Sequence, residues 1–221
     1  MDECGDKHHG PVSFIDDGSI LLVEGWQVGV VSATAGGVSW GPIRSNVHEM
    51  PHILRSTIPR FEALLDEASL LNRISKQECR EEWLQYAASV GVLSATRNEP
   101  GHSDRVRRVS AIYAGCLRGE FTADIHDASF LYLWEHLGKG HFVTESGMLG
   151  CYDRHDNHPQ SGDMVCLIKG SLRPLILRRQ EKAGYYTLVS TGMLYAEPAV
   201  VNGQGLTSYE PTGNLEEFRI V

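Results

Sequence analysis

The chain has 221 residues, of which 42% are hydrophobic, and this is enough to bury a sizeable core in one domain. Its 28 acidic residues outnumber 20 basic ones, so the net charge of -8 argues against nucleic acid or an anionic lipid surface as a main partner. No apolar run approaches the roughly 18 residues that a membrane helix needs, and the acidic start lacks the features of a signal peptide. These observations predict a cytoplasmic protein with neither a membrane nor a nucleic-acid partner.

The first predicted elements are two or three short strands between Pro11 and Val31, where apolar and polar residues alternate. Asp16-Asp17-Gly18 has the composition of a hairpin turn within this segment. Ala35-Gly36-Gly37 then interrupts the pattern, and a loop containing two prolines is predicted from Trp40 to Leu54.

Helical periodicity follows over residues 56–138. Thr57 is predicted to cap a first helix, and Ser75 with Glu78 forms the pattern of a capping box before a second. Each helix has apolar residues three and four positions apart, which indicates one buried face. Those residues are Phe61, Leu64, Leu65, Ala68 and Leu71 in the first helix, and Cys79, Trp83, Tyr86, Ala87 and Val90 in the second.

Two further helices are predicted before the last strands. Ser103 is expected to cap the third helix and Gly119 to end it. The fourth is expected from Asp124 to Leu137, with Gly138 as a left-handed C-terminal residue. His136 lies near the end of that helix, where a cation is favoured, so the sequence assigns it a structural capping role.

The last part of the chain reads as two β-hairpins, the first from His141 to Tyr152 and the second from Met164 to Arg178. The predicted fold class is α+β: a small bent antiparallel sheet or barrel built from both chain ends, with a central bundle of about four helices. We expect a single domain over 1–221, with strands in 11–31 and 141–197 and a helical insert in 56–138.

Three motifs in this region occur in a recognisable order: HFVTESGMLG from His141, GDMVCLIKGSLRPLILR from Gly162, and YYTLVSTGMLYAE from Tyr185. The order resembles the closing segment of fungal heterokaryon-incompatibility (HET) domain proteins. A short β pattern that follows the signature domain of such proteins is similar to the residues Phe14, Asp17, Gly18, Leu21, Val23, Gly25, Val28 and Val31. The resemblance implies the region after the signature domain. The TIR-like part is lacking, and with it any nucleotide-cleaving acid that could be carried over.

Several polar groups have a structural interpretation. The five cysteines are scattered without a CxxC pair, which predicts reduced thiols. At least one of Arg173, Arg178 and Arg179 is expected near the core, paired with Asp163 or Glu145.

No metal or cofactor is predicted. The loop residues His155, Asp156 and His158 fit no zinc spacing, and the sequence has neither a GxGxxG motif nor a P-loop.

Candidate catalytic residues are the histidines His48 and His52, in the loop that joins sheet and helices, and His126 at the start of the fourth helix. Histidine is suited to proton transfer near neutral pH, and pockets tend to form at such junctions. The equally simple alternative is that these are loop histidines bonded to backbone. The candidate substrate-binding residues are Trp40, Arg44, Arg55, Trp83 and Tyr86, although the aromatic ones are equally explained as core.

Two functions remain open from the sequence. The first is a cofactor-independent enzyme of fungal secondary metabolism, a cyclase, isomerase or dehydratase (lyase) that holds a small apolar molecule between sheet and helices. The second is a non-catalytic protein-interaction module related to HET incompatibility proteins. Either could act as a homodimer.

Overall fold

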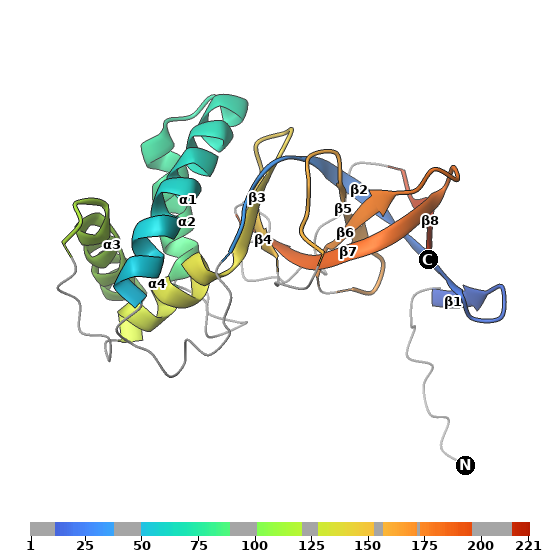
Figure 1. Ribbon diagram of the computed structural model, residues 1–221, viewed down its shortest axis with the longest axis horizontal. Helices are drawn as coiled ribbons and strands as arrows, with labels where there is room; N and C mark the ends of the chain where they lie inside the picture. The colour runs from blue at the N-terminus through green and yellow to red at the C-terminus, as the bar shows by residue number, and fades with distance from the viewer. Residues whose placement is uncertain are drawn as a thin grey trace, which may run out of the picture.

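The computed structural model describes residues 12–37, 50–88, 101–120, 128–152, 157–171, 173–195 and 214–221. Strands come from both ends of the chain and helices from its middle, which confirms the predicted α+β class. The helices lie at one end of the molecule, with β3 and β4 beside them (Figure 1). The elements are β1 (Val12–Ile15), β2 (Ile20–Ala35), α1 (Met50–Asn72), α2 (Lys76–Ala87), α3 (His102–Leu117), α4 (Ala128–Gly138), β3 (Gly140–Thr144), β4 (Leu149–Tyr152), β5 (Met164–Ile168), β6 (Leu175–Arg179), β7 (Tyr185–Leu194) and β8 (Glu216–Ile220).

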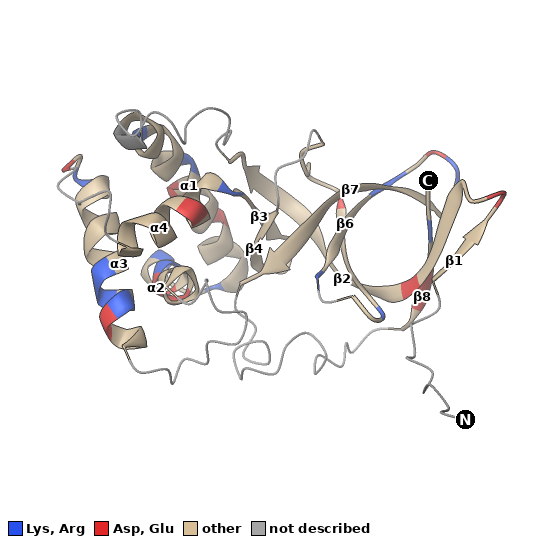
Figure 2. Cartoon of the chain, turned by 90° about the horizontal axis from the view of Figure 1, so that it is seen from below, with Lys and Arg blue, Asp and Glu red and all other residues tan. Residues whose placement is uncertain are grey.

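The strands form one strongly bent sheet that closes on itself through β2. From β2 the hydrogen-bonded neighbours run through β5 and β6 to β7. The path returns from β7 to β2 through β8 on one route and through β4 and β3 on the other. All pairs are antiparallel except β7 with β8, which are parallel. Figure 2 shows the resulting ring of strands.

Local irregularities bend β2 so that it can serve both parts of this sheet. Its register shifts between Gln27 and Gly29 against β5, and again between Val31 and Ala33 against β3. Such bulges increase the twist and bend of a strand. Gly25 allows the close approach of β5, because a Cβ there would clash with the Leu167 carbonyl oxygen.

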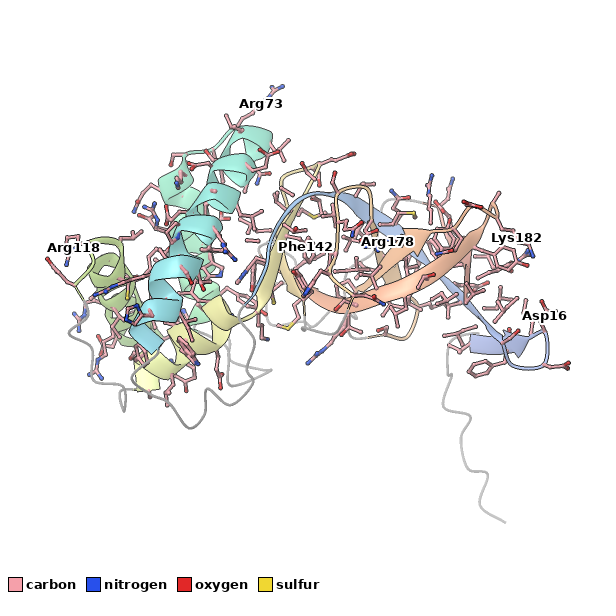
Figure 3. The ribbon with its side chains drawn as sticks, in the orientation of Figure 1. Asp16, Arg73, Arg118, Phe142, Arg178 and Lys182 are labelled. Atoms are coloured by element: carbon pink, nitrogen blue, oxygen red, sulfur yellow. The ribbon has the colours of Figure 1, made fainter. Side chains whose placement is uncertain are left out.

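Two apolar clusters fill the sheet. One contains Val23, Met164, Cys166, Ile168, Leu177, Tyr186, Phe218 and Ile220, and the other Val31, Phe142, Tyr152, Val165, Ile176 and Val189. Phe142 lies on β3, where the ring approaches the helices (Figure 3). Inward-facing residues from distant segments therefore stabilise the ring by burying apolar surface.

An ion pair between the half-buried Arg178 and the buried Asp163 joins β6 to the start of β5. Arg178 donates from Nε to Oδ1 of Asp163 and from Nη2 to Oδ2, both at 2.8 Å. The Asp163 backbone carbonyl accepts from the Val31 amide at 2.8 Å, so the same residue also contacts β2. Figure 3 labels Arg178 on this part of the ring. The predicted pairing of an arginine with Asp163 is confirmed, and the alternative partner Glu145 is not the one used by Arg178.

Helix α1 begins earlier than predicted. It starts at Met50, so residues 50–54 are helical rather than part of a loop, and Thr57 is not a cap. The Thr57 hydroxyl instead donates to the Ile53 carbonyl at 2.9 Å from inside the helix. Pro51 explains the early start, because a proline in the first turn lacks only an amide that would be unpaired there.

The other helix ends agree in part with the predictions. The capping box of Ser75 and Glu78 is confirmed, and Gly119 follows α3 with a φ of 76°. Ser103 is not a cap, because α3 begins at His102 after a left-handed Gly101. Gly138 belongs to α4 and is not among the residues with positive φ. The predicted residues 124–127 of α4 lie outside the described residues.

The largest core joins the helices to β3 and β4. Buried residues of all four helices contribute to it, together with Ala35, Val143, Leu149, Cys151 and Tyr195 from the sheet side. At the far end of α1, the Asn72 side chain donates to the Gly147 carbonyl in the turn between β3 and β4 at 2.6 Å. None of the described helices is long and apolar enough to cross a membrane.

Deleting residues 1–31 should abolish cooperative folding. The strands β5 and β8 would lose the part of β2 with which they pair, and β3 would lose one of its pairing residues. The measurement is thermal unfolding followed by circular dichroism. Phe14→Ser serves as a control, since this side chain is 68% exposed and its loss should leave the midpoint nearly unchanged. A truncated chain that melts cooperatively near the full-length midpoint would contradict the central position of β2.

Candidate functional site

The structure separates the residues that the sequence nominated. Four of them, Trp40, Arg44, His48 and His126, lie outside the described residues. His52 and Arg55 are exposed near the start of α1, whereas Trp83 is buried and Tyr86 is half-buried on α2. Trp83 and Tyr86 lie in one aromatic cluster between the helices and the sheet.

That cluster is the candidate site, and we call it the polar aromatic cluster. Its members are Trp83, Tyr86, His136, His141 and Tyr195. They come from α2, from the adjacent elements α4 and β3, and from the residue after β7, so three parts of the chain that are far apart in the sequence converge here.

The rings pack closely with one another. The centroids of Tyr86 and Tyr195 are 4.3 Å apart, and those of Tyr86 and His136 are 5.5 Å apart. His141 lies 6.0 Å from Tyr195 and 6.3 Å from Trp83 by the same measure. Such separations are typical of interacting aromatic pairs.

Most polar atoms of the cluster are buried without a partner. The Trp83 indole nitrogen, the Tyr195 hydroxyl, Nε2 of His141 and both ring nitrogens of His136 have no hydrogen bond. Trp83 and Cys151 are close enough to the Tyr195 hydroxyl to influence its pKa, but neither meets the geometry of a hydrogen bond to it. Because buried polar groups are nearly always paired in folded proteins, this concentration needs an explanation.

The tautomer of His141 follows from its surroundings. A backbone hydrogen bond at Lys139 favours the protonated ring, which means that the ring donates to a carbonyl there. Since Nε2 is the unpartnered nitrogen, the donor is Nδ1. A neutral imidazole carries one proton, so Nε2 of His141 presents a lone pair to the cluster.

Burial keeps the histidines neutral. Desolvation, with a smaller effect of the Lys139 charge, lowers the pKa of His136 to about 3. Desolvation also lowers the pKa of His141 to about 3, assisted by His136 and Lys139. The capping role assigned to His136 is therefore wrong, because a neutral buried ring is no cation at a helix end.

The tyrosines of the cluster stay protonated for the same reason. Burial is the main cause that raises the pKa of Tyr86 and of Tyr195. The Tyr86 hydroxyl contacts the Met193 sulfur at 3.8 Å, and both residues are partly exposed. Tyr86 and Met193 thus form the more accessible side of the cluster.

A second polar network lies next to the cluster but is fully paired. The hydroxyl of Tyr113, whose ring contacts Trp83, donates to Glu62 at 2.6 Å, and Arg80 binds the same carboxylate through two nitrogens. Burial opposes the charge of Glu62, yet the hydrogen bonds from Arg80, Tyr113 and Lys76 hold its pKa below the usual value. This network satisfies its polar groups, so we assign it a structural role.

Sequence reasoning missed His141 and Tyr195 as site residues. His141 opens a strand and Tyr195 closes the last motif, so each was interpreted as part of a hairpin. The available signal was that both are polar within apolar strand patterns. Their spatial relation to His136 and Trp83 depends on tertiary packing, which periodicity does not reveal.

Within the described ranges, no three His, Cys, Asp or Glu residues are placed to hold a metal ion. The loop residues His155 and Asp156, to which the sequence assigned no metal, lie outside the described residues. The chain matches no protein-family model, no curated protein and no solved structure.

Acidification should destabilise the protein between pH 7 and pH 5. The pKa of His136 and of His141 is about 3 in the folded state and near 6.5 when unfolded, so the unfolded chain binds more protons in this window. The free energy of unfolding should therefore fall as the pH falls, by about 1.4 kcal/mol per pH unit for each fully titrating histidine.

Urea unfolding at several pH values measures this dependence. His136→Gln and His141→Gln should each flatten it, because an amide does not titrate. Leu70→Ser provides the control, since it changes an exposed side chain that does not titrate and should keep the wild-type slope. Equal slopes in all four proteins would mean that the buried histidines are not neutral in the folded state.

Proposed function

We propose that the protein is an enzyme without a tightly held cofactor, which acts on a small, largely apolar molecule by proton transfer. The reaction class is cyclisation, isomerisation or dehydration, as in fungal secondary metabolism. The single observation that carries the proposal is the polar aromatic cluster, where buried donors and acceptors lack partners between the helices and the sheet.

Energetics support a functional interpretation of this cluster. A buried polar group without a hydrogen bond costs roughly 1–3 kcal/mol, so several together lower the free energy of unfolding substantially. A molecule that brought its own oxygen atoms into the cluster would pair these groups. Binding would then supply the hydrogen bonds that the cluster lacks in the folded protein, and their free energy would favour the complex.

The protonation states also suit such chemistry. A neutral His141 has a lone pair that can accept a hydrogen bond, and a protonated Tyr195 can donate one. The surrounding rings, including Phe61 at 4.6 Å from His141, provide apolar contact for a small molecule and exclude water.

We further propose that the chain is related to the region that follows the signature domain of HET proteins. The first resembling segment, Phe14 to Val31, contains the end of β1 and most of β2, and the second, 142–195, contributes strands β3 to β7. The motif residues are thus concentrated in the ring. This placement supports a common fold, while the reaction is proposed from the cluster.

Binding can be tested by nuclear magnetic resonance with labelled histidine side chains. We expect cyclohexanone and 2-naphthol, as small neutral probes, to shift the ring signals of His136 and His141 in a saturable manner. Tyr195→Phe should weaken binding about tenfold through loss of one hydrogen bond. The matched control is Tyr186→Phe, which alters a buried tyrosine inside the ring. Absence of a saturable shift with either probe would refute a small-molecule site.

A second candidate function is an interaction module, favoured by the hairpin of β1 and β2. β1 pairs only with β2 among the described strands, so its outer edge has no strand partner there. Phe14 is 68% exposed and Val12 is 53% exposed on this edge. An edge strand with apolar side chains is a template for pairing with another chain, and a second copy of β1 provides a matching edge.

Sedimentation velocity at rising concentration tests this second function. The wild type should form dimers, and Phe14→Ser should shift the equilibrium toward monomer about tenfold or more. Leu70→Ser is the control, because Leu70 is 76% exposed on α1, away from the hairpin. A wild type that sediments as a monomer at about 100 µM, a concentration at which a dimer held by only about 5–6 kcal/mol would be populated, contradicts assembly through β1.

A further inference from the structure

We infer that Met193 is a site of oxidation by peroxides, and that the Tyr86 hydroxyl holds the resulting sulfoxide in the folded protein. The two residues lie on β7 and α2, at the more accessible side of the polar aromatic cluster. The inference goes beyond the proposed function and does not depend on it, because it requires neither a substrate nor a proton transfer within the cluster.

A direct contact joins the two side chains. The Tyr86 hydroxyl donates to the Met193 sulfur at 3.8 Å, although the residues are 107 positions apart in the sequence. A thioether sulfur is only a weak acceptor, so this hydroxyl is weakly satisfied in the reduced protein. Oxidation adds a polar oxygen to the same sulfur. Because the methionine side chain has three rotatable bonds, it can turn that oxygen toward the hydroxyl.

Exposure distinguishes Met193 from Met164. The Met193 side chain packs against the helical core but stays half-buried, as does Tyr86. Met164 is 1% exposed inside the ring, where its sulfur accepts from Nε of Arg179 at 3.2 Å. A small oxidant from solvent therefore reaches the sulfur of Met193 and is kept from that of Met164.

The surroundings of Met193 favour an added oxygen atom. Burial and Cys151 raise the pKa of Tyr86, which keeps its hydroxyl a donor, and the exposed Arg173 is close enough to oppose this rise. A sulfoxide oxygen carries partial negative charge, so a hydroxyl and a nearby cation both stabilise it. Oxidation of a methionine usually disrupts an apolar core. At this position the new acceptor has a donor already beside it, and we expect the fold to be retained.

A hydroperoxide balances the step as the oxidant. A lone pair of the Met193 sulfur attacks one oxygen of hydrogen peroxide, the O–O bond breaks and an S–O bond forms. The departing oxygen takes the proton of the transferred hydroxyl and leaves as water, so the sulfur loses two electrons and the peroxide gains them. Dedicated reductases return methionine sulfoxide to methionine, which makes the modification a switch. In the oxidised state the contact between α2 and β7 is strengthened.

Peptide mass spectrometry tests the assignment of the site. The full chain is exposed briefly to hydrogen peroxide, and sulfoxide is quantified at each methionine over time. We expect oxidation at Met193 to be about tenfold or more faster than at the enclosed Met164. Equal rates at these two residues would overturn the inference.

Urea unfolding before and after oxidation tests the role of Tyr86. The wild type should keep its midpoint, whereas oxidation should raise the unfolding equilibrium constant of Tyr86→Phe about tenfold, because the sulfoxide then lacks its donor. Tyr186→Phe, which alters a buried tyrosine inside the ring, is the matched control and should respond as the wild type does. Peroxide-treated Met193→Leu measures the contribution of the other methionines. An equal response of Tyr86→Phe and the wild type would refute a sulfoxide held by this hydroxyl.

A third measurement uses the wild type alone and stays decisive if Tyr86→Phe does not fold. Methionine methyl groups are labelled with carbon-13 and observed by nuclear magnetic resonance. The methyl signal of oxidised Met193 should be displaced from its position in the urea-unfolded protein, because the ring of Tyr86 lies beside it. A signal at the unfolded position, in an otherwise native spectrum, would show that the sulfoxide is not held and would overturn the inference.

Discussion

The fold depends on the length and curvature of one strand. β2 spans 16 residues and pairs with β1, β8, β5 and β3 in succession. Its first part belongs to the ring, and its last residues contact the helical core through Ala35. Because β3 carries both His141 and the hydrogen bonds to β2, the bend in β2 also fixes one wall of the polar aromatic cluster.

The two parts of the molecule treat buried polar groups differently. Asp163 and Arg178 satisfy each other in the ring, and Glu62 collects three donors between helices. Beside Trp83, both nitrogens of His136, Nε2 of His141 and the Tyr195 hydroxyl are left unpaired. Natural proteins commonly leave buried polar groups unpaired at functional sites. The contrast between paired and unpaired polar groups within one core is the physical basis for proposing a function for the cluster.

Sequence predicted those features that depend on neighbouring residues. The capping box of Ser75 and Glu78 is local chemistry, and the α+β class follows from the change of period along the chain. The start of α1 was predicted wrongly because two prolines were taken as breakers, although one of them is tolerated in a first turn. His136 was misassigned since its position on a helix is a local property, whereas its burial depends on α2 and Tyr195.

The order in which the strands pair has a consequence for folding in the cell. Leu21 of β2 pairs with Ile220 of β8, 199 positions later in the chain. A ribosome that adds roughly 5–20 residues per second therefore needs about ten seconds or more after releasing β2 before β8 exists. During that time the apolar face of β2 has only part of its final partners. Such a long separation between paired residues predicts slow closure of the ring.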